Sequence, residues 1–202
     1  MARKTSTIRW ESNPFVKRPE KESILNQRGK VIWMTGLSGS GKTTLAIDIE
    51  KELVNRGFLT QVFDADIVRA TINRDLGFTM EDRLQNIFRV AHLSRIFLEA
   101  GFVVINCFIS PTNHIRHLAR KIIGPEDYIE VFVNAPLGLC ESRDPKGLYK
   151  EARQKRLLNF TGIDSPYEVP EKPDLELNTE HFSKKELVRQ FLDFILPIIT
   201  KK

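Results

Sequence analysis

The sequence has few cysteines, no long apolar run and no secretion signal, and each absence excludes a class of protein. Cys107 and Cys140 stand far apart in apolar stretches, which is typical of buried free thiols in a reducing compartment and not of a disulfide framework. No apolar run approaches the length that spans a bilayer, and no apolar segment follows the basic N-terminus. We therefore expect a cytoplasmic protein that has no membrane partner.

The charge is mildly basic, with 31 Lys and Arg against 26 Asp and Glu and a net charge of +5. This balance suits anionic substrates such as nucleotides. The basic residues are spread along the chain and form no nucleic-acid-binding signature, so we expect no nucleic acid partner. The 202 residues predict one domain over 31–202, preceded by a polar arm over 1–30 with little regular structure.

Apolar periodicity and turn residues predict alternating strands and helices. The expected strands are 31–35, 60–64, 102–108, 128–133 and 175–177. The expected helices are 42–56, 82–100, 113–123, 136–142 and a last one from the Ser183-x-x-Glu186 capping box to just before Pro197. This alternation predicts an α/β three-layer sandwich with a mainly parallel five-stranded sheet and helices on both faces. A long loop within 143–170 is expected to act as a lid.

One stretch carries a specific chemistry. An apolar run ends at Gly36, and Gly36-x-x-x-x-Gly41-Lys42-Thr43 then matches the P-loop of nucleoside triphosphate-binding proteins. Glycines let the backbone approach a ligand closely, and successive N–H groups with the start of the next helix attract phosphate. Lys42 is expected to reach the β- and γ-phosphates of ATP, and the Thr43 hydroxyl to help hold Mg²⁺. The predicted ATP-binding residues are Gly36, Leu37, Ser38, Gly39, Ser40, Gly41, Lys42, Thr43 and Thr44.

Two carboxylates, Asp64 and Asp66, directly follow the second expected strand, at the sheet edge where α/β folds bind ligands. Either carboxylate is a candidate to bind Mg²⁺, directly or through water, or to accept the proton of an acceptor hydroxyl. The sequence contains no Asn-Lys-x-Asp guanine-reading segment, which disfavours a GTPase and favours a small-molecule kinase. Lys146 from the lid would complete the cationic clamp on the phosphoryl group, and Arg69 and Arg83 would grip an anionic acceptor.

Seven ordered segments resemble the adenylyl-sulfate kinase family. They are Gly36–Thr44, Asp64–Arg69, Asn73–Phe78, Glu81–Ile87, Phe108–Pro111, Arg143–Tyr149 and Asn159–Ser165. The set is far more specific than a P-loop alone. The resemblance implies an enzyme that transfers the γ-phosphoryl group of ATP to the 3′-hydroxyl of adenosine 5′-phosphosulfate (APS). The product would be 3′-phosphoadenylyl sulfate, the activated sulfate donor of sulfate assimilation.

The resemblance also implies roles for single residues. Phe78 and Phe160 are expected to sandwich the adenine of the acceptor, as aromatic faces stack on bases. The catalytic candidates are thus Lys42, Asp66 and Lys146 from the motifs and Ser110 from the resemblance, and the Mg²⁺ candidates, direct or through water, are Thr43, Asp64 and Asp66. The acceptor-binding residues implied are Asp66, Arg69, Phe78, Arg83, Asn86, Ile109, Ser110, Lys146 and Phe160.

Ser110 and Arg143 each have two competing interpretations. Ser110 matches a position given in this family as a phosphoserine intermediate, but direct in-line transfer needs no covalent step and the sequence shows no activating base beside it. We therefore expect Ser110 to contact the acceptor without being phosphorylated. Arg143 is expected either to lie flat over the ATP base or to form a structural ion pair.

The sequence departs from the family pattern beside the expected acceptor site. The family usually reads Asp-Gly-Asp-Asn-x-Arg after the second strand, whereas Ala65 and Ile67 replace the Gly and the Asn here. Phe88 and Thr112-Asn113 also differ from the family's usual residues. Two alternatives therefore stay open, namely a kinase for another nucleotide conjugate, such as a cytidine diphosphoramidate, and a non-catalytic nucleotide-binding regulator. The resemblance further implies a homodimer and a functional link to a separate ATP sulfurylase.

Overall fold

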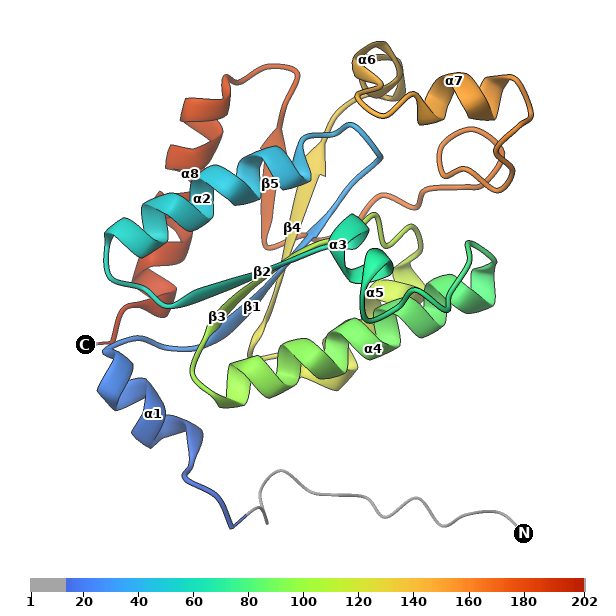
Figure 1. The fold of residues 1–202 in the computed structure, drawn as a ribbon. Helices are drawn as coiled ribbons and strands as arrows, with labels where there is room; N and C mark the ends of the chain where they lie inside the picture. Colours follow the sequence, from blue (N-terminus) through green and yellow to red (C-terminus); the bar gives the residue numbers. More distant parts are fainter. Residues whose placement is uncertain (1–13, 202) are drawn as a thin grey trace, which may run out of the picture.

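The computed structural model describes residues 14–201, so the first part of the expected N-terminal arm lies outside the described residues. Five strands form one sheet, every pairing is parallel, and the strand order is β2-β3-β1-β4-β5 (Figure 1). The strands are β1 (Lys30–Thr35), β2 (Thr60–Asp64), β3 (Val103–Cys107), β4 (Tyr128–Asn134) and β5 (Leu175–Asn178). The predicted parallel sheet is confirmed.

Helices cover both faces of this sheet. They are α1 (Arg18–Leu25), α2 (Lys42–Asn55), α3 (Ala65–Ala70), α4 (Met80–Glu99), α5 (Asn113–Ile123), α6 (Leu137–Arg143), α7 (Leu148–Arg153) and α8 (Lys184–Ile199). Figure 1 shows α2 and α8 on one face and α4 and α5 on the other, which confirms the predicted three layers. Within residues 14–201 every helix is too short or too polar to span a lipid bilayer.

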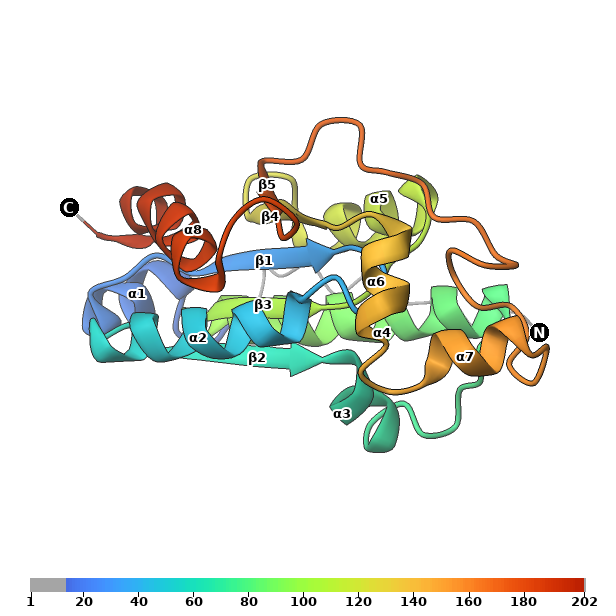
Figure 2. The ribbon, with the colours of Figure 1, turned by 90° about the horizontal axis from the view of Figure 1, so that it is seen from above.

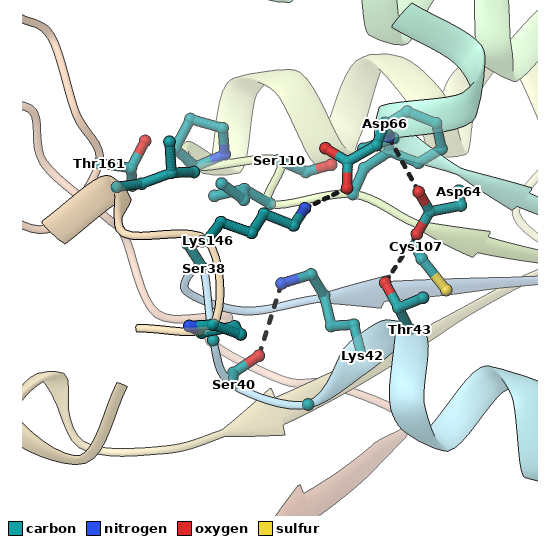
Figure 3. A pocket seen from close by; sticks show the side chains of 18 of the residues that line it. Ser38, Ser40, Lys42, Thr43, Asp64, Asp66, Cys107, Ser110, Lys146 and Thr161 are labelled. Carbon is teal, nitrogen blue, oxygen red and sulfur yellow. Dashed lines mark hydrogen bonds and ion pairs between the residues drawn. The ribbon is translucent and has the colours of Figure 1, made fainter. Parts of the chain in front are cut away.

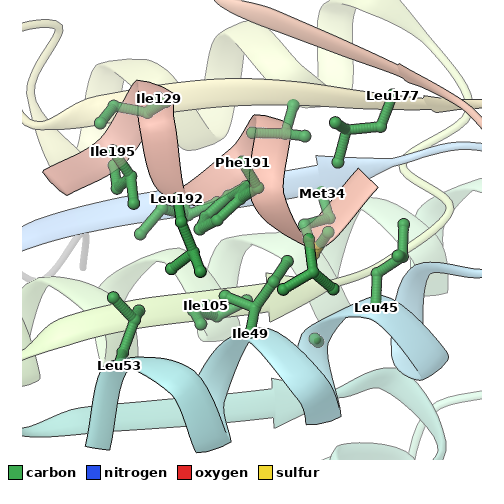
Figure 4. Packing of buried hydrophobic residues seen from close by; sticks show 14 of the residues in the cluster. Met34, Leu45, Ile49, Leu53, Ile105, Ile129, Leu177, Phe191, Leu192 and Ile195 are labelled. Carbon is green, nitrogen blue, oxygen red and sulfur yellow. The ribbon is translucent and has the colours of Figure 1, made fainter. Parts of the chain in front are cut away.

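The central strand β1 supplies side chains to both layers because successive residues of a strand point to opposite faces. Ile32 and Met34 lie in a cluster with the apolar faces of α2 and α8, whereas Val31 and Trp33 lie in a cluster with α4 and α5. Figure 4 shows the first cluster, in which Leu45, Ile49 and Leu53 of α2 meet Phe191, Leu192 and Ile195 of α8. This two-sided core fixes β1, and β1 leads directly into the P-loop.

The polar residue within the buried strand β3 has a local explanation. The Asn106 amide is fully buried and donates to Ser94 Oγ of α4, with an N–O distance of 3.0 Å. A buried polar group costs little once it is hydrogen-bonded. Asn106 therefore fastens α4 to the sheet.

The prediction of little regular structure over 1–30 is wrong for residues 18–25, which form α1. At the start of this helix the Lys17 backbone N–H donates to Glu20 Oε1 at 3.1 Å. Arg18 pairs with Asp127 and Glu22 and donates to the Gly29 carbonyl oxygen at 2.7 Å. The Arg18–Asp127 pair fixes α1 beside the amino end of β1, and it joins residues 109 positions apart, which no local pattern indicates.

Two short helices were not predicted, and one predicted helix end is wrong. The six-residue α3 begins where the Asp64 carboxylate accepts a hydrogen bond from the Asp66 N–H, and α7 is equally short. The last helix begins at its predicted capping box but passes through Pro197 to Ile199. Proline loses one backbone hydrogen bond there. The last turn persists because Ile195 and Ile199 are fully buried against the sheet.

Candidate active site

The P-loop joins β1 to α2 at the carboxyl edge of the sheet. Gly36 has φ = 151°, and a Cβ at this position would lie 2.4 Å from the Val133 carbonyl oxygen, so only glycine fits. Gly41 has φ = 106° and precedes Lys42, the first residue of α2. The loop therefore presents backbone N–H groups and the start of a 14-residue helix to one side of a cavity.

Lys42 is buried, and its ammonium group closes on the loop itself. Its Nζ donates to the carbonyl oxygens of Gly36 at 2.9 Å and of Leu37 at 2.8 Å, and it lies 3.5 Å from Ser40 Oγ (Figure 3). Burial lowers the pKa of Lys42 to about 8. The Lys42 ammonium group has only neutral oxygens as partners in the loop, so a bound phosphate would stabilise its charge.

The first carboxylate after β2 faces the P-loop. Thr43 Oγ1 donates to Asp64 Oδ2 at 2.6 Å, and the Asp66 N–H donates to Asp64 Oδ1 at 2.9 Å (Figure 3). A hydroxyl and a carboxylate in contact beside a phosphate site are a ligand pair that Mg²⁺ commonly uses, because Mg²⁺ takes the rest of its ligands from phosphate and water. No cluster of three or more His, Cys, Asp or Glu that would hold a metal alone occurs within residues 14–201.

The second carboxylate points across the cavity to the expected lid. Asp66 forms an ion pair with Lys146 Nζ, and Figure 3 shows this pair between the P-loop and Ser110. Both side chains are at least half exposed, so each is free to exchange its partner for a ligand. The structure therefore brings two of the predicted catalytic residues together from segments 80 positions apart.

The acceptor side of the cavity carries two arginines. Arg69 Nη1 donates to the Gly77 carbonyl oxygen at 2.8 Å, and Arg83 Nε donates to the Phe78 carbonyl oxygen at 3.0 Å. Burial lowers the pKa of both guanidinium groups, and the pKa of Arg69 is lowered further by the charge of Arg83. Neither forms an ion pair with any residue among 14–201. This wall is therefore suited to an anion.

Two aromatic rings also line the cavity. Phe78 is 57% exposed and lies under the Arg69 guanidinium, 4.5 Å from the ring centroid, whereas Phe160 is 7% exposed and packs edge-on against Tyr149. Arg83 also donates to Thr161 Oγ1 at 2.6 Å, so it links the Phe78 turn to the loop that carries Phe160. An exposed ring beside two cations is suited to stacking on a base that carries phosphate.

Ser110 has a strained backbone, and its hydroxyl oxygen already accepts a hydrogen bond. Its φ is 44°, and its Oγ accepts a hydrogen bond from Trp33 Nε1 at 2.9 Å. Trp33 is a donor that cannot remove a proton, so this contact does not activate the serine. The neighbouring Ile109 carbonyl oxygen accepts from Thr35 Oγ1 at 2.6 Å. The geometry is suited to a fixed wall beside a ligand.

One cavity of about 800 Å³ joins these parts. Its lining includes Ser38, Gly39, Ser40, Gly41, Lys42, Thr43, Thr44, Asp64, Asp66, Arg69, Phe78, Arg83, Asn86, Ile109, Ser110, Arg143, Lys146 and Phe160. Every predicted site residue except Gly36 and Leu37 is therefore on its wall, and those two hold Lys42 from behind. Figure 2 shows α3, α6 and α7 around this end of the sheet.

Comparison with known proteins gives the family. The model of the adenylylsulphate kinase family matches residues 28–178, which is more than half of the chain. The chain belongs to this family. It is an ATP-dependent kinase, and a curated adenylyl-sulfate kinase of Bacteroides thetaiotaomicron is 51% identical to it over 188 residues, covering 93% of this chain and 94% of the relative.

Solved structures of adenylyl-sulfate kinases share the fold. The Mycobacterium tuberculosis APS kinase CysC, solved in complex with AMPPNP and APS, is 43% identical, has a TM-score of 0.81, and covers 84% of this chain and 98% of its own. A hexameric APS kinase from Thiobacillus denitrificans is 26% identical with a TM-score of 0.65, and covers 86% of this chain and 30% of its own.

Of the two expectations for Arg143 in this kinase, the structural ion pair is not found within residues 14–201. Arg143 Nη2 donates to the Thr179 carbonyl oxygen at 2.9 Å, and Nη1 donates to Thr179 Oγ1 at 3.0 Å and to the Gly39 carbonyl oxygen at 3.2 Å. The guanidinium group thus connects α6, the P-loop and the end of β5 by hydrogen bonds and not by an ion pair. Arg143 still lines the cavity beside the P-loop, so contact with ATP stays a prediction.

Sequence reasoning missed several residues that support the site. Arg116 lies on α5, and its side chain is 2% exposed. It pairs with Glu130 at 3.1 Å and donates to the carbonyl oxygens of Ser110 and Glu168, each at 2.8 Å. Tyr149 donates from its hydroxyl to the Ser38 carbonyl oxygen at 2.9 Å and so fastens α7 to the P-loop. No sequence signal distinguishes such a buried arginine from a surface one.

Proposed function

We propose that this kinase transfers the γ-phosphoryl group of ATP to the 3′-hydroxyl of APS. The observation that carries the proposal is the shared cavity, in which a phosphate-binding loop faces a wall of two arginines and an exposed aromatic ring. APS offers matching groups, namely a phosphosulfate for the arginines and an adenine for the ring. Family membership and the named relatives support the same reaction.

The P-loop side would hold ATP. Backbone N–H groups of residues 37–43 would bind its phosphates, and Lys42 would exchange its carbonyl contacts for the β- and γ-phosphates. Thr43 and Asp64 would hold Mg²⁺, directly or through water, because their oxygens already meet at 2.6 Å. When bound, Mg²⁺ would neutralise phosphate charge during transfer.

Asp66 and Lys146 would act on the reacting groups. Asp66 would accept the proton of the 3′-hydroxyl, since its carboxylate lines the same cavity as the P-loop and the two arginines. Lys146 would leave Asp66 for the transferred phosphoryl oxygens, where its charge adds to that of Lys42. We propose that the segment around residues 143–170 acts as the lid that brings Lys146 to this position.

Most side chains that differ from the family pattern lie away from the cavity in which the acceptor would bind. Ala65 is on the cavity wall, but Ile67 is 67% exposed and lies outside the lining. The side chains of Phe88, Thr112 and Asn113 are also outside the lining of this cavity. Four of the five differing side chains therefore lie off the cavity wall, which supports APS over another nucleotide conjugate.

A kinetic assay tests the proposal. ADP release is measured with ATP, Mg²⁺ and either APS or a cytidine diphosphoramidate as acceptor. We expect saturable turnover with APS and none above background with the cytidine compound. The opposite preference would move the function to the alternative acceptor, and a folded protein that binds ATP without turnover on either would favour a regulator.

We further propose a cytoplasmic homodimer whose acceptor is supplied by a separate ATP sulfurylase. The hexameric relative supports association of such domains, although its own chain is much longer. Light scattering after gel filtration measures the assembly directly. A molar mass near twice the 23.3 kDa chain is expected, and the monomer mass would contradict the dimer.

A further inference from the structure

A chain of polar side chains lies behind the acceptor wall and reaches the cavity at Asn86. Asn86 lines the cavity, whereas Asn73, in the turn after α3, is fully buried and does not. Asn73 Nδ2 donates to Asn86 Oδ1 at 2.9 Å. Behind Asn73, Arg89 Nη1 lies 3.4 Å from Asn73 Oδ1, and Arg89 holds Asp75 by two contacts of 2.7 and 2.8 Å.

Arg89 determines how the side-chain amides of Asn73 and Asn86 are oriented, and we call this Arg89–Asn73–Asn86 series the relay. A guanidinium group has only donors, so the atom of Asn73 that faces it must be the acceptor Oδ1. The Asn73 amide must then turn its NH₂ group to Asn86, and only the carbonyl oxygen of Asn86 can accept it. The group that remains for the cavity is the Asn86 NH₂, which has no hydrogen-bond partner within residues 14–201.

We infer that Asn73 is a positioning residue, held in direction by Arg89, that makes Asn86 present a hydrogen-bond donor to the acceptor substrate. The inference rests on the proposed function for the identity of that acceptor. A donor selects ligand oxygens with lone pairs, such as those of phosphate, sulfate or a ribose hydroxyl. Without this relay the Asn86 amide could turn either its NH₂ group or its carbonyl oxygen to the cavity, and the carbonyl oxygen would repel a ligand oxygen.

Asn73→Asp reverses the relay with almost no change of shape. The carboxylate cannot donate, so Asn86 would turn its NH₂ group to Asp at position 73 and its carbonyl oxygen to the cavity. We expect the KM for APS to rise about 10- to 100-fold, since a hydrogen bond to a charged oxygen is lost. The KM for ATP should stay within about twofold because the P-loop contacts are unaffected.

Arg89→Glu tests the same relay from the surface, where folding is less at risk. An acceptor at position 89 would draw the Asn73 NH₂ outward, and the KM for APS should again rise with little change for ATP. Arg189→Glu is the matched control, because Arg189 also forms an exposed pair, with Asp193, but lies on α8 away from the relay. It should leave both constants unchanged.

A double-mutant cycle separates positioning from support of the fold. In an Asn86→Ala background, Asn73→Asp should have no further effect on the KM for APS, because Asn73 acts through Asn86. Additive effects, or equal rises in the KM for APS and ATP, would overturn the inference. An unchanged KM for APS in the folded Asn73→Asp protein would also overturn it.

A second readout does not depend on turnover. Side-chain amide NMR of the ATP-free protein should show slow hydrogen exchange for the Asn73 NH₂ group and fast exchange for that of Asn86. In Arg89→Glu the Asn86 NH₂ group should become the protected one. If the wild type shows this pattern but does not phosphorylate APS, the proposed function fails while the relay stands. The reverse pattern in the wild type would refute the relay.

Discussion

The buried P-loop lysine predicts that ATP binding depends on pH. Burial lowers the pKa of Lys42 from an ordinary value near 10.5 to about 8, so the empty site begins to lose its cation just above neutral pH. The phosphates of ATP stabilise the charged form and are themselves ionised above pH 7.5, since the last phosphate pKa is about 6. Binding at high pH must therefore first return a proton to Lys42.

The magnitude follows from this pKa. Lys42 is about 90% charged at pH 7 and about 10% charged at pH 9, which corresponds to about a tenfold loss of ATP affinity over this range. The thiol of Cys107 and the hydroxyl of Tyr167 do not interfere, because burial raises the pKa of each to about 12. In the absence of ATP, Lys42 carries its proton between pH 8 and 10.5 in the unfolded chain but loses it in the folded protein. Lys42 therefore makes the free energy of unfolding rise with pH in this range.

Isothermal titration of ATP with Mg²⁺ at pH 7, 8 and 9 measures the effect. Lys42→Arg is the matched control, since a guanidinium group stays charged throughout this range. We expect the Kd of the wild type to rise about tenfold and the Kd of the variant to stay flat. A flat wild-type Kd, or the same rise in Lys42→Arg, would refute the assignment of the lowered pKa to this lysine.

Three further predictions follow from the cavity wall and its supports. Arg83→Ala should raise the KM for APS at least about tenfold with little change in the KM for ATP. Equal rises in both constants would show that Arg83 does not act specifically on the acceptor. Ser110→Ala should keep turnover within about tenfold, and mass spectrometry should find no phosphoserine during wild-type turnover; a phosphorylated Ser110 would contradict this. Arg116→Leu should cost about 3–5 kcal/mol of stability in urea, because it leaves the buried Glu130 unpaired, and a loss below about 1 kcal/mol would count against that role.

Local patterns predict the sheet and its main helices well. Apolar runs and turn residues place β2 at 60–64 and α5 at 113–123 with the bounds that the structure has. The P-loop is equally readable, because Gly36 and Gly41 occupy backbone conformations that favour glycine. These features are encoded in neighbouring residues, and the parallel pairing of the strands then follows from the alternation of strands and helices.

Features that depend on distant partners were not predictable. The helix over 18–25 is fixed by Arg18 and Asp127, which lie 109 positions apart. The buried state of Arg116 and the direction of the Asn73 amide likewise depend on partners that only the fold brings near. Pro197 gave a misleading signal, because burial of the last turn outweighs the loss of one hydrogen bond.

We expect one cavity to hold both substrates while a phosphoryl group moves from ATP to the 3′-hydroxyl of APS. The most direct measurement is the mass and ³¹P NMR spectrum of the product formed from ATP, Mg²⁺ and APS, with 3′-deoxy APS as a parallel acceptor and Lys42→Ala as the inactive control. We predict a 3′-phosphorylated product from APS alone, and inhibition without phosphorylation by the 3′-deoxy analogue. A phosphorylated 3′-deoxy analogue, or turnover in Lys42→Ala near that of the wild type, would contradict the account.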